Sequence, residues 1–257
     1  MYCMQFHALI ERAASDAWPA AVSEPLGEWR LRYDPVVPSK RCNSVLSAGA
    51  LPDRADWMDR IREFYAERGA PVRFQVGAAS PPELDVRLEA EGYKAEVPCV
   101  VMTMRLQGDI GFSGNNAHVP PRQWSSLPDD EWLEAWRTME GHPERTLDGF
   151  REMMRVRIGA PARYGCIRMD GRIAAVSSAV VHGRLSGLFN VIVHPDYRRL
   201  GLAESLVRGL VSWSREQGAD TMYLQAVRDN EPALRLYAKL GFAISHRYHY
   251  RTLDPLA

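Results

Sequence analysis

The 257-residue chain contains no run of about 18 consecutive apolar residues, the length that a membrane-spanning helix requires. It also has no basic excess, because 32 Lys and Arg residues balance 32 Asp and Glu residues. Proteins that bind nucleic acid usually carry a basic excess or stripe, so the balance argues against that class. We therefore expect a protein whose partners include neither a membrane nor a nucleic acid.

Cysteine is scarce, and the four cysteines are far apart in the sequence: Cys3, Cys42, Cys99 and Cys166. They form no Cys-x-x-Cys pair and no Cys/His group at metal-ligand spacing, which predicts reduced thiols and no metal site. The N-terminal stretch MYCMQFHALIERAASDAW lacks the basic and apolar regions of a secretory signal. These absences predict a cytoplasmic location.

The remaining composition is that of an ordinary globular protein, with 46% apolar and 25% charged residues. A polar stretch rich in Gly, Asn and Pro, residues 107–123, separates two regularly patterned halves. We predict two domains, residues 1–110 and 117–257. Both halves mix strand and helix patterns, so the expected fold class is α/β (α+β), with a mixed central sheet flanked by helices.

Hydrophobic periodicity predicts the individual elements of each half. In the N-terminal half, strands are predicted at 28–35, 42–49, 71–77 and 97–106, and helices at 55–69 and 81–93. In the C-terminal half, helices are predicted at 128–141, 145–159, 201–218 and 231–241. Strands of that half are predicted three times within 162–195, once at 221–227 and once or twice within 242–253. The pair Asp170-Gly171 predicts a tight hairpin turn between the first two strands of 162–195.

The two halves resemble one another at a constant offset of 149 residues. RGAPVRFQV at 68–76 aligns without a gap on QGADTMYLQ at 217–225, and EAEGY at 89–93 aligns on AKLGF at 238–242. The order helix, Gly-Ala, strand, helix, Gly-aromatic, strand therefore occurs twice, which favours a diverged duplication.

The stretch VHPDYRRLGLAESL, residues 193–206, places two arginines and a glycine between an apolar strand and a helix. Pro195 ends the strand because it lacks the N–H group that a sheet requires. Gly201 opens the helix, whose first N–H groups lack intrahelical acceptors and lie at the positive end of its dipole. Together with Arg198 and Arg199, they predict a phosphate-binding loop, whereas an isolated arginine pair would indicate only a solvated turn.

Two motifs make this loop specific. The patterns GxxxxGK[ST] and GxGxxG of nucleotide-binding loops are absent. The pattern R-x-x-G-x-A at Arg198, Gly201 and Ala203 resembles the acetyl-CoA pyrophosphate loop of the GNAT superfamily of N-acetyltransferases. NEPALRLYAKLGF, residues 230–242, resembles the superfamily's N-x-x-A-x-x-L-Y-x-x-x-G-F segment. The resemblance covers residues 117–253, and the N-terminal half is similar to a degenerate copy.

The resemblance implies a site for acetyl-CoA as acyl donor. It implies a V-shaped splay between the strand that ends at Val193 and the strand at 221–227, opened by a β-bulge. Pantetheine would contact the main chain of the first strand, and the loop would hold the pyrophosphate. The implied cofactor-binding residues are Val191, Ile192, Val193, Arg198, Arg199, Leu200, Gly201, Leu202, Ala203 and Asn230.

The resemblance also implies the chemistry. The amine attacks the thioester directly, and a backbone N–H near Ile192 stabilises the developing oxyanion. Tyr237 protonates the departing thiolate, and Asn190 is the second expected catalytic residue because it can orient water or substrate. Gly187 stands where some members carry a glutamate base. The other candidates for a base are His182, His194, Glu231 and a chain of water molecules.

Several residues have simpler explanations. Trp132 and Trp136 lie at i, i+4 spacing, which favours a core stripe over an acceptor pocket. HRYHY, residues 246–250, alternates like a strand, and packing or a subunit contact explains it better than a metal. Tyr237, at helical spacing from Ala233, has a core role as its alternative.

The same offset of 149 residues tests the N-terminal half for a second site. It places Gly49 and Pro52 at the positions of Arg198 and Gly201. It places Pro81 at the position of Asn230 and Leu88 at that of Tyr237. The N-terminal half therefore lacks the basic glycine loop and the proton donor, and we expect it to be a structural partner.

The sequence as a whole predicts an N-acetyltransferase that moves an acetyl group from acetyl-CoA to a primary amine. A small-molecule acceptor is favoured over a protein, and the expected state is a monomer or homodimer. The alternative is a non-catalytic acyl-CoA-binding sensor, which the unassigned base leaves open.

Overall fold

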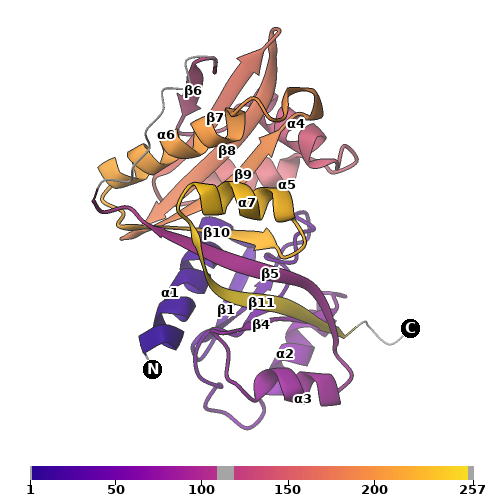
Figure 1. Cartoon of the computed structure of the whole chain (residues 1–257). Coiled ribbons are helices and arrows are strands. Elements are labelled where there is room, and N and C mark those ends of the chain that lie inside the picture. Colours follow the sequence, from indigo (N-terminus) through magenta and orange to yellow (C-terminus); the bar gives the residue numbers. More distant parts are fainter. Residues whose placement is uncertain (1, 109–118, 254–257) are drawn as a thin grey trace. The chain divides into compact units, whose positions relative to one another are not determined.

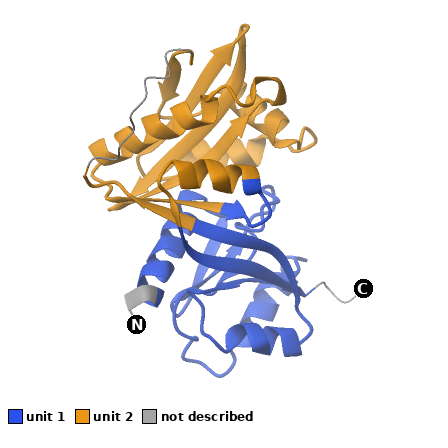
Figure 2. Cartoon of the chain, viewed as in Figure 1, with its two compact units in different colours: residues 1–101, 226–231, 244–257 blue, residues 102–225, 232–243 orange. Residues whose placement is uncertain are grey.

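The computed structural model describes residues 2–108 and 119–253, so the centre of the predicted linker, 109–118, lies outside the described residues (Figure 1). The chain divides into two compact units (Figure 2). Unit 1 comprises Met1–Val101, Ala226–Glu231 and Ile244–Ala257, and unit 2 comprises Met102–Gln225 and Pro232–Ala243. Among the described helices, none combines the length and the apolar character needed to cross a lipid bilayer.

Unit 1 is a mixed sheet with helices packed on it. Its elements are α1 (Tyr2–Ala17), β1 (Val22–Leu26), β2 (Trp29–Tyr33), β3 (Val45–Leu46), α2 (Trp57–Ala66), β4 (Val72–Gly77), α3 (Leu84–Ala90), most of β5 (Lys94–Arg105) and β11 (Ala243–Leu253). The strand order is β1-β2-β3-β4-β11-β5. β3 and β4 are parallel, whereas β1–β2, β2–β3 and β4–β11 are antiparallel.

The core of unit 1 explains why its predicted elements form. α2 buries Trp57, Ile61 and Phe64, whose i, i+4, i+7 spacing places them on one face of the helix. Trp29 of β2 meets Trp57 edge to face, with ring centroids 5.3 Å apart, and Phe74 of β4 at 6.3 Å. The aromatic cluster holds α2 against the sheet.

Unit 2 consists of parallel and antiparallel strands with helices. Its elements are β6 (Arg122–Ser125), α4 (Asp130–Glu140), α5 (Asp148–Glu152), a π-helical turn (Met153–Arg157), β7 (Ala162–Met169), β8 (Arg172–His182), β9 (Leu185–Val193), a 3-10 turn (Pro195–Tyr197), α6 (Leu202–Glu216), β10 (Thr221–Val227) and α7 (Glu231–Lys239). The strand order is β10-β9-β8-β7-β6, with the end of β5 next to β10. β9 and β10 are parallel, while β6 to β9 pair antiparallel.

The predicted hairpin between β7 and β8 is confirmed. Asp170 has a φ of 50° and Gly171 a φ of 79°, the two consecutive positive values that a type I′ turn requires. Trp132 and Trp136 of α4 are 4% and 1% exposed, which confirms their assignment to the core.

Other elements differ from the sequence-based expectation. The sequence patterns did not indicate α1, β1 or β6, and the strand predicted at 42–49 is reduced to the two residues of β3. The helix predicted at 145–159 is shorter in the structure: α5 starts at Asp148 and continues directly as the π-helical turn that ends at Arg157. The N–H of Ile158 donates to the Met153 carbonyl at 3.1 Å, an i to i+5 bond that a 3.6-residue periodicity does not reveal.

The elements of the two halves repeat at the offset of 149 residues. The offset carries Val72, the first residue of β4, onto Thr221, the first residue of β10. It likewise superimposes the sequence ranges of α2 on α6, α3 on α7 and β5 on β11. The parallel pair β3–β4 has its counterpart in the parallel pair β9–β10. The order of elements in space therefore repeats, as well as the order in the sequence.

The last strands of the two halves are exchanged. β11 follows α7 in the chain, yet it pairs with β4 of unit 1 from Tyr248 opposite Gly77 to Leu253 opposite Val72. β5 follows α3, yet its final residues, 102–105, belong to unit 2, where β5 is the neighbour of β10. Figure 1 shows β5 and β11 running along one another. The compact units therefore depart from the continuous domains 1–110 and 117–257.

Expressing residues 1–110 and 117–257 separately tests this exchange. The fragment 117–257 lacks β4, to which β11 bonds, and β5, which lies next to β10. Since unpaired strand edges aggregate, we expect each fragment alone to be unfolded or insoluble by circular dichroism and gel filtration. Co-expression should restore a folded complex. A folded, monomeric 117–257 fragment would contradict the exchange.

Candidate active site

A β-bulge interrupts β9 in the middle of unit 2. Val176 of β8 lies opposite Ile192, whereas Ser178 lies opposite Phe189. β9 therefore has one residue more than β8 between these two pairs. The extra residue is accommodated at Asn190, whose φ of 56° is left-handed and uncommon for a residue other than glycine. The bulge implied by the resemblance is therefore present in the structure.

A hydrogen bond holds the bulge in this conformation. The Nδ2 group of Asn190 donates to the Oγ atom of Ser178 at 2.9 Å. Ser178 is only 2% exposed, so its hydroxyl is fixed in the sheet. The sequence did not identify Ser178 as a site residue. Which residue of β8 lies near Asn190 depends on the register between β8 and β9, and the bulge changes that register.

The bulge coincides with the point where β9 leaves β10. The parallel register between them runs from Leu185 opposite Thr221 to Leu188 opposite Leu224. The residues of β9 before the bulge are buried, whereas Asn190 to Val193 are only half-buried. After Leu188, β9 thus has no pairing with β10 in the register of the described residues. Its main-chain N–H and C=O groups on that side are therefore available to a ligand.

The loop after β9 presents backbone N–H groups at the start of α6. Gly201 precedes the helix with a φ of 78° and supplies no side-chain cap. The first N–H to reach an acceptor at the start of the helix is that of Ser205, which donates to the Gly201 carbonyl at 2.9 Å. The N–H groups of Leu202, Ala203 and Glu204 thus have no acceptor among the described residues, as expected for an anion-binding helix start.

The charges around the loop favour an anion. Arg198 and Arg199 are exposed, and neither forms an ion pair with a described carboxylate. Asp196, the acidic residue of the loop, pairs with Arg172 at 3.0 Å. Tyr197 is buried and donates its hydroxyl to Asp170 at 2.7 Å, which fixes the position of the loop.

A three-residue ion cluster connects the loop to α7. Glu204, in the first turn of α6, accepts hydrogen bonds from Lys239 Nζ at 2.8 Å and Arg208 Nη2 at 2.7 Å. The bond from Lys239 is the main reason why the pKa of Glu204 lies below its usual value. The carboxylate is therefore neutralised, and it ties the start of α6 to the last turn of α7.

Tyr237 lies on α7 and is 8% exposed. Its ring packs against Phe242 with centroids 5.8 Å apart, and its hydroxyl has no hydrogen-bond partner among the described residues. Burial raises the pKa of Tyr237 to about 12, so the phenol carries its proton at neutral pH. The side chain has the protonation state that a general acid needs.

The remaining predicted site residue, Asn230, lies in the stretch 226–231 of unit 1, directly before α7. Its backbone N–H donates to the Val227 carbonyl at 3.0 Å. The other predicted residues, Asn190 to Val193, Arg198 to Ala203 and Tyr237, all belong to unit 2.

Comparison with known proteins identifies the family. The family described as "Probable histone acetyltransferase Rv0428c C-terminal" matches residues 8–251 of this chain. The chain belongs to this family of GNAT N-acetyltransferases. It is 28% identical to the "Uncharacterized N-acetyltransferase YobR" of Bacillus subtilis over 242 residues, which cover 94% of this chain and 96% of the relative.

Two solved structures share the fold of this acetyltransferase along nearly its whole length. A GCN5-related N-acetyltransferase from Kribbella flavida has a TM-score of 0.68 at 17% identity, covering 97% of this chain and 96% of its own. A tandem GNAT protein from the clavulanic acid biosynthesis pathway has a TM-score of 0.62 at 16% identity, covering 96% and 89%. The chain thus has a tandem GNAT fold. Its family shows that it is an acyltransferase.

The position of the superfamily's glutamate base cannot hold a side chain in this acetyltransferase. A Cβ atom at Gly187 would lie 2.5 Å from Cε2 of Phe189 and 2.6 Å from the hydroxyl oxygen of Tyr223. Both distances are shorter than a van der Waals contact. The two aromatic side chains therefore occupy the space that a glutamate would need.

Neither candidate histidine of unit 2 is placed as a base at the bulge. His182 pairs with Leu185 at the far end of β9, roughly 16 Å along the strand from the bulge. Nδ1 of His194 accepts the N–H of Asp196 at 3.3 Å and so caps the 3-10 turn. Neither arrangement provides a base at the bulge, and Glu231 belongs to unit 1.

An internal carboxylate fills the corresponding loop of unit 1. Oε2 of Glu28 accepts the N–H of Ala50 at 3.2 Å and a hydrogen bond from Nη2 of Arg12 at 3.0 Å. A Cβ atom at Gly49, the counterpart of Arg198, would lie 1.7 Å from the same oxygen. The residues that correspond to the phosphate loop are thus already bound to an anion of the chain itself, which agrees with a degenerate half.

Proposed function

We propose that unit 2 binds acetyl-CoA and transfers its acetyl group to a primary amine. The observation that carries this proposal is the start of α6, where free N–H groups follow two uncompensated arginines behind the bulged strand β9. Phosphate oxygens are the ligands that such a helix start and guanidinium pair prefer. Asp196 and Glu204 each pair with a cationic side chain, so they repel phosphate oxygens less than unpaired carboxylates would.

In this proposal the main chain of Val191 to Val193 holds pantetheine along the side of β9 that β10 has left. An extended chain with amide groups fits that edge, because its hydrogen bonds replace those of a missing strand. The pyrophosphate then lies on residues 198–203.

The acetyl transfer needs one bond to form and one to break. The amine nitrogen bonds to the thioester carbonyl carbon, and the N–H near Ile192 stabilises the oxyanion. When the C–S bond breaks, Tyr237 gives its proton to the thiolate sulfur, and the proton that the bonded nitrogen loses returns through water to the phenolate. Asn190 keeps the bulge in shape, so that the backbone donor meets the developing negative charge.

The proton of the acceptor's ammonium group leaves through ordered water in this proposal. Neither histidine of unit 2 that was considered as a base lies at the bulge, and Gly187 carries no side chain. A primary amine with a modest pKa is a suitable acceptor, because a sufficient fraction is neutral at pH 8. We infer a small molecule as acceptor, since the chain is net neutral and shows no charge bias for a polymer.

A thermal-shift titration with acetyl-CoA, paired with thiol release across a panel of small primary amines, tests the proposal. We expect the melting temperature to rise with acetyl-CoA and CoA to be released with at least one amine. If acetyl-CoA neither stabilises the protein nor supports CoA release, the proposed donor is wrong. Stabilisation without release from any amine or peptide would favour a sensor that binds acyl-CoA.

Ser178→Ala tests whether the bulge matters for binding. Removing the hydroxyl leaves the Asn190 amide without its bond, worth about 1 kcal/mol, so acetyl-CoA affinity should fall roughly fivefold by calorimetry. Ser177→Ala is the matched control, because Ser177 is also fully buried but its hydroxyl makes no hydrogen bond with a described residue. Equal affinities of the two variants would show that the bond does not control the site.

A further inference from the structure

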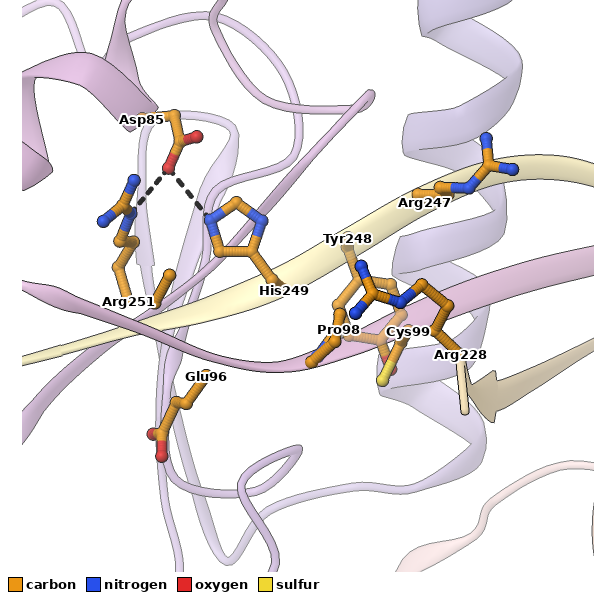
Figure 3. A pocket seen from close by; sticks show the side chains of 10 residues that line it. Asp85, Glu96, Pro98, Cys99, Arg228, Arg247, Tyr248, His249 and Arg251 are labelled. Atoms are coloured by element: carbon orange, nitrogen blue, oxygen red, sulfur yellow. Dashed lines mark hydrogen bonds and ion pairs between the residues drawn. The ribbon is translucent and has the colours of Figure 1, made fainter. Parts of the chain in front are cut away.

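Unit 1 contains a cavity of about 430 Å³ (Figure 3). Its lining residues do not include Gly49 or Ala50, the loop residues that Glu28 contacts. Its walls come from α3, the start of β5, β11 and the turn that follows β10, all within unit 1. The volume lies within the range of sites for small molecules, roughly 300–1,000 Å³. Cys99 of β5 and Tyr248 of β11, which correspond at the offset of 149 residues, both line it.

A backbone irregularity in β5 lies in the wall of the cavity. Val97 has a φ of 48°, which is a genuine outlier for a β-branched residue. It is followed by Pro98, which lines the cavity. β5 therefore departs from regular strand geometry where the space is found, and such departures are concentrated at binding sites.

The two carboxylates in the wall are already neutralised. Asp85 lies between Arg251 and His249, with its Oδ1 atom 2.7 Å from Nε of Arg251 and 2.9 Å from Nε2 of His249 (Figure 3). Burial raises the pKa of Asp85, but the hydrogen bond from Arg251 and the neighbouring His249 outweigh it and hold the pKa below its usual value. Glu96 pairs with Lys40 at 2.7 Å, and Arg73 lies 3.3 Å from it.

The remaining charges of the wall are cationic. Arg247 is exposed and forms no ion pair with any described carboxylate. The backbone N–H of Arg228 donates to the Pro98 carbonyl at 2.8 Å, which fixes the start of this side chain against β5. Its guanidinium pairs only with the adjacent Asp229, in a pair 58% and 74% exposed that is worth little in water. Two guanidinium groups at this cavity thus have no strong counter-ion.

The rest of the wall is apolar or weakly polar. Ala95, Pro98, Cys99 and Tyr248 line it, and Cys99 and Tyr248 are 6% and 4% exposed. Asp85 binds Nε2 of His249, and Nδ1 has no hydrogen-bond partner among the described residues. The cavity therefore combines cationic donors with an apolar surface and one imidazole nitrogen.

We propose that this cavity is a second binding site, for a small organic carboxylate with an apolar body. The carboxylate binds Arg228 and Arg247, whose planar forks match its two oxygens, and the apolar body lies on Pro98 and Tyr248. A phosphate dianion fits less well, since it is usually bound by several backbone N–H groups and these walls supply side chains. The site goes beyond the proposed acetyl transfer and does not depend on it.

Calorimetry on the full chain without acetyl-CoA tests the site, with 3-phenylpropionate as the probe and the neutral 3-phenylpropan-1-ol as its isostere. We expect 3-phenylpropionate to bind at least tenfold more tightly than the alcohol. Arg228→Met and Arg247→Met should each weaken its binding about tenfold and leave the melting temperature unchanged, because both side chains are exposed. Arg60→Met, an exposed arginine of α2 outside the cavity, should bind like the unmodified chain. Equal binding of acid and alcohol, or normal binding by both cavity variants, would overturn the proposal.

L-Phenylalanine is a second probe of the site. It carries the same carboxylate on an apolar body of similar size, so it should compete with 3-phenylpropionate. Failure to compete would contradict the site, whatever the outcome of the acetyl-CoA titration.

Discussion

Gly201→Glu is expected to abolish acetyl-CoA binding. Gly201 has a φ of 78°, where a residue with a Cβ atom costs about 1–2 kcal/mol. The new carboxylate would also stand at the free N–H groups of α6 and repel the pyrophosphate. Together these effects should lower the affinity at least about a hundredfold, which corresponds to about 2.7 kcal/mol. Calorimetry with acetyl-CoA measures the loss.

Two variants separate the causes. Gly201→Ala imposes the backbone strain without the charge and should retain most of the affinity. Ser212→Glu adds the same charge on the exposed face of α6, about 16 Å further along the helix, and should bind acetyl-CoA normally. Normal binding by Gly201→Glu would show that the pyrophosphate lies elsewhere.

Tyr237→Phe is expected to slow acetyl transfer about a hundredfold while acetyl-CoA affinity stays within twofold. The variant keeps the ring that packs on Phe242 and removes only the proton donor. Loss of a general acid typically lowers the rate by about 10²–10⁴-fold, and we expect the lower end of that range. Stability should not fall, because the hydroxyl has no hydrogen-bond partner among the described residues. Steady-state kinetics with a saturating amine gives kcat, and a thermal scan gives stability. An unchanged kcat would exclude Tyr237 as the acid.

The pH profile provides a second readout for Tyr237. Because burial raises the pKa of Tyr237 to about 12, the phenol stays protonated throughout the accessible alkaline range. The rate of the unmodified chain should therefore rise as the amine loses its proton and then stay level up to pH 10. A fall in kcat between pH 8 and 10 would show that the proton donor has an ordinary or lowered pKa.

The end of β9 and the start of α6 could be predicted from sequence because both depend on local residues. Pro195 and Gly201 each restrict the backbone at their own positions, and the free N–H groups follow from the start of any helix. The shape of β9 could not be predicted in the same way. Nothing in LFNVIV distinguishes a regular strand from one in which Asn190 takes a left-handed conformation, since the bulge depends on the register against β8.

The exchange of β5 and β11 was equally hidden from the sequence. Both strands alternate, and both follow a short helix that ends in Gly-aromatic, so either could pair with β4. Strand partners are chosen by packing across the whole sheet, which local patterns do not record. The cavity of unit 1 escaped prediction for the same reason, because Asp85, Arg228 and His249, which line it, are far apart in the sequence.

The exchanged strands also bear on why a chain would keep a half that has lost its cofactor loop. β4 has β11 as its neighbour, and β10 has the end of β5, so each half supplies a strand to the other's sheet. A deletion that removed the first half would also remove the strand next to β10. The first half can therefore lose its loop chemistry without harm to the second half, but loss of its fold would remove the strand next to β10.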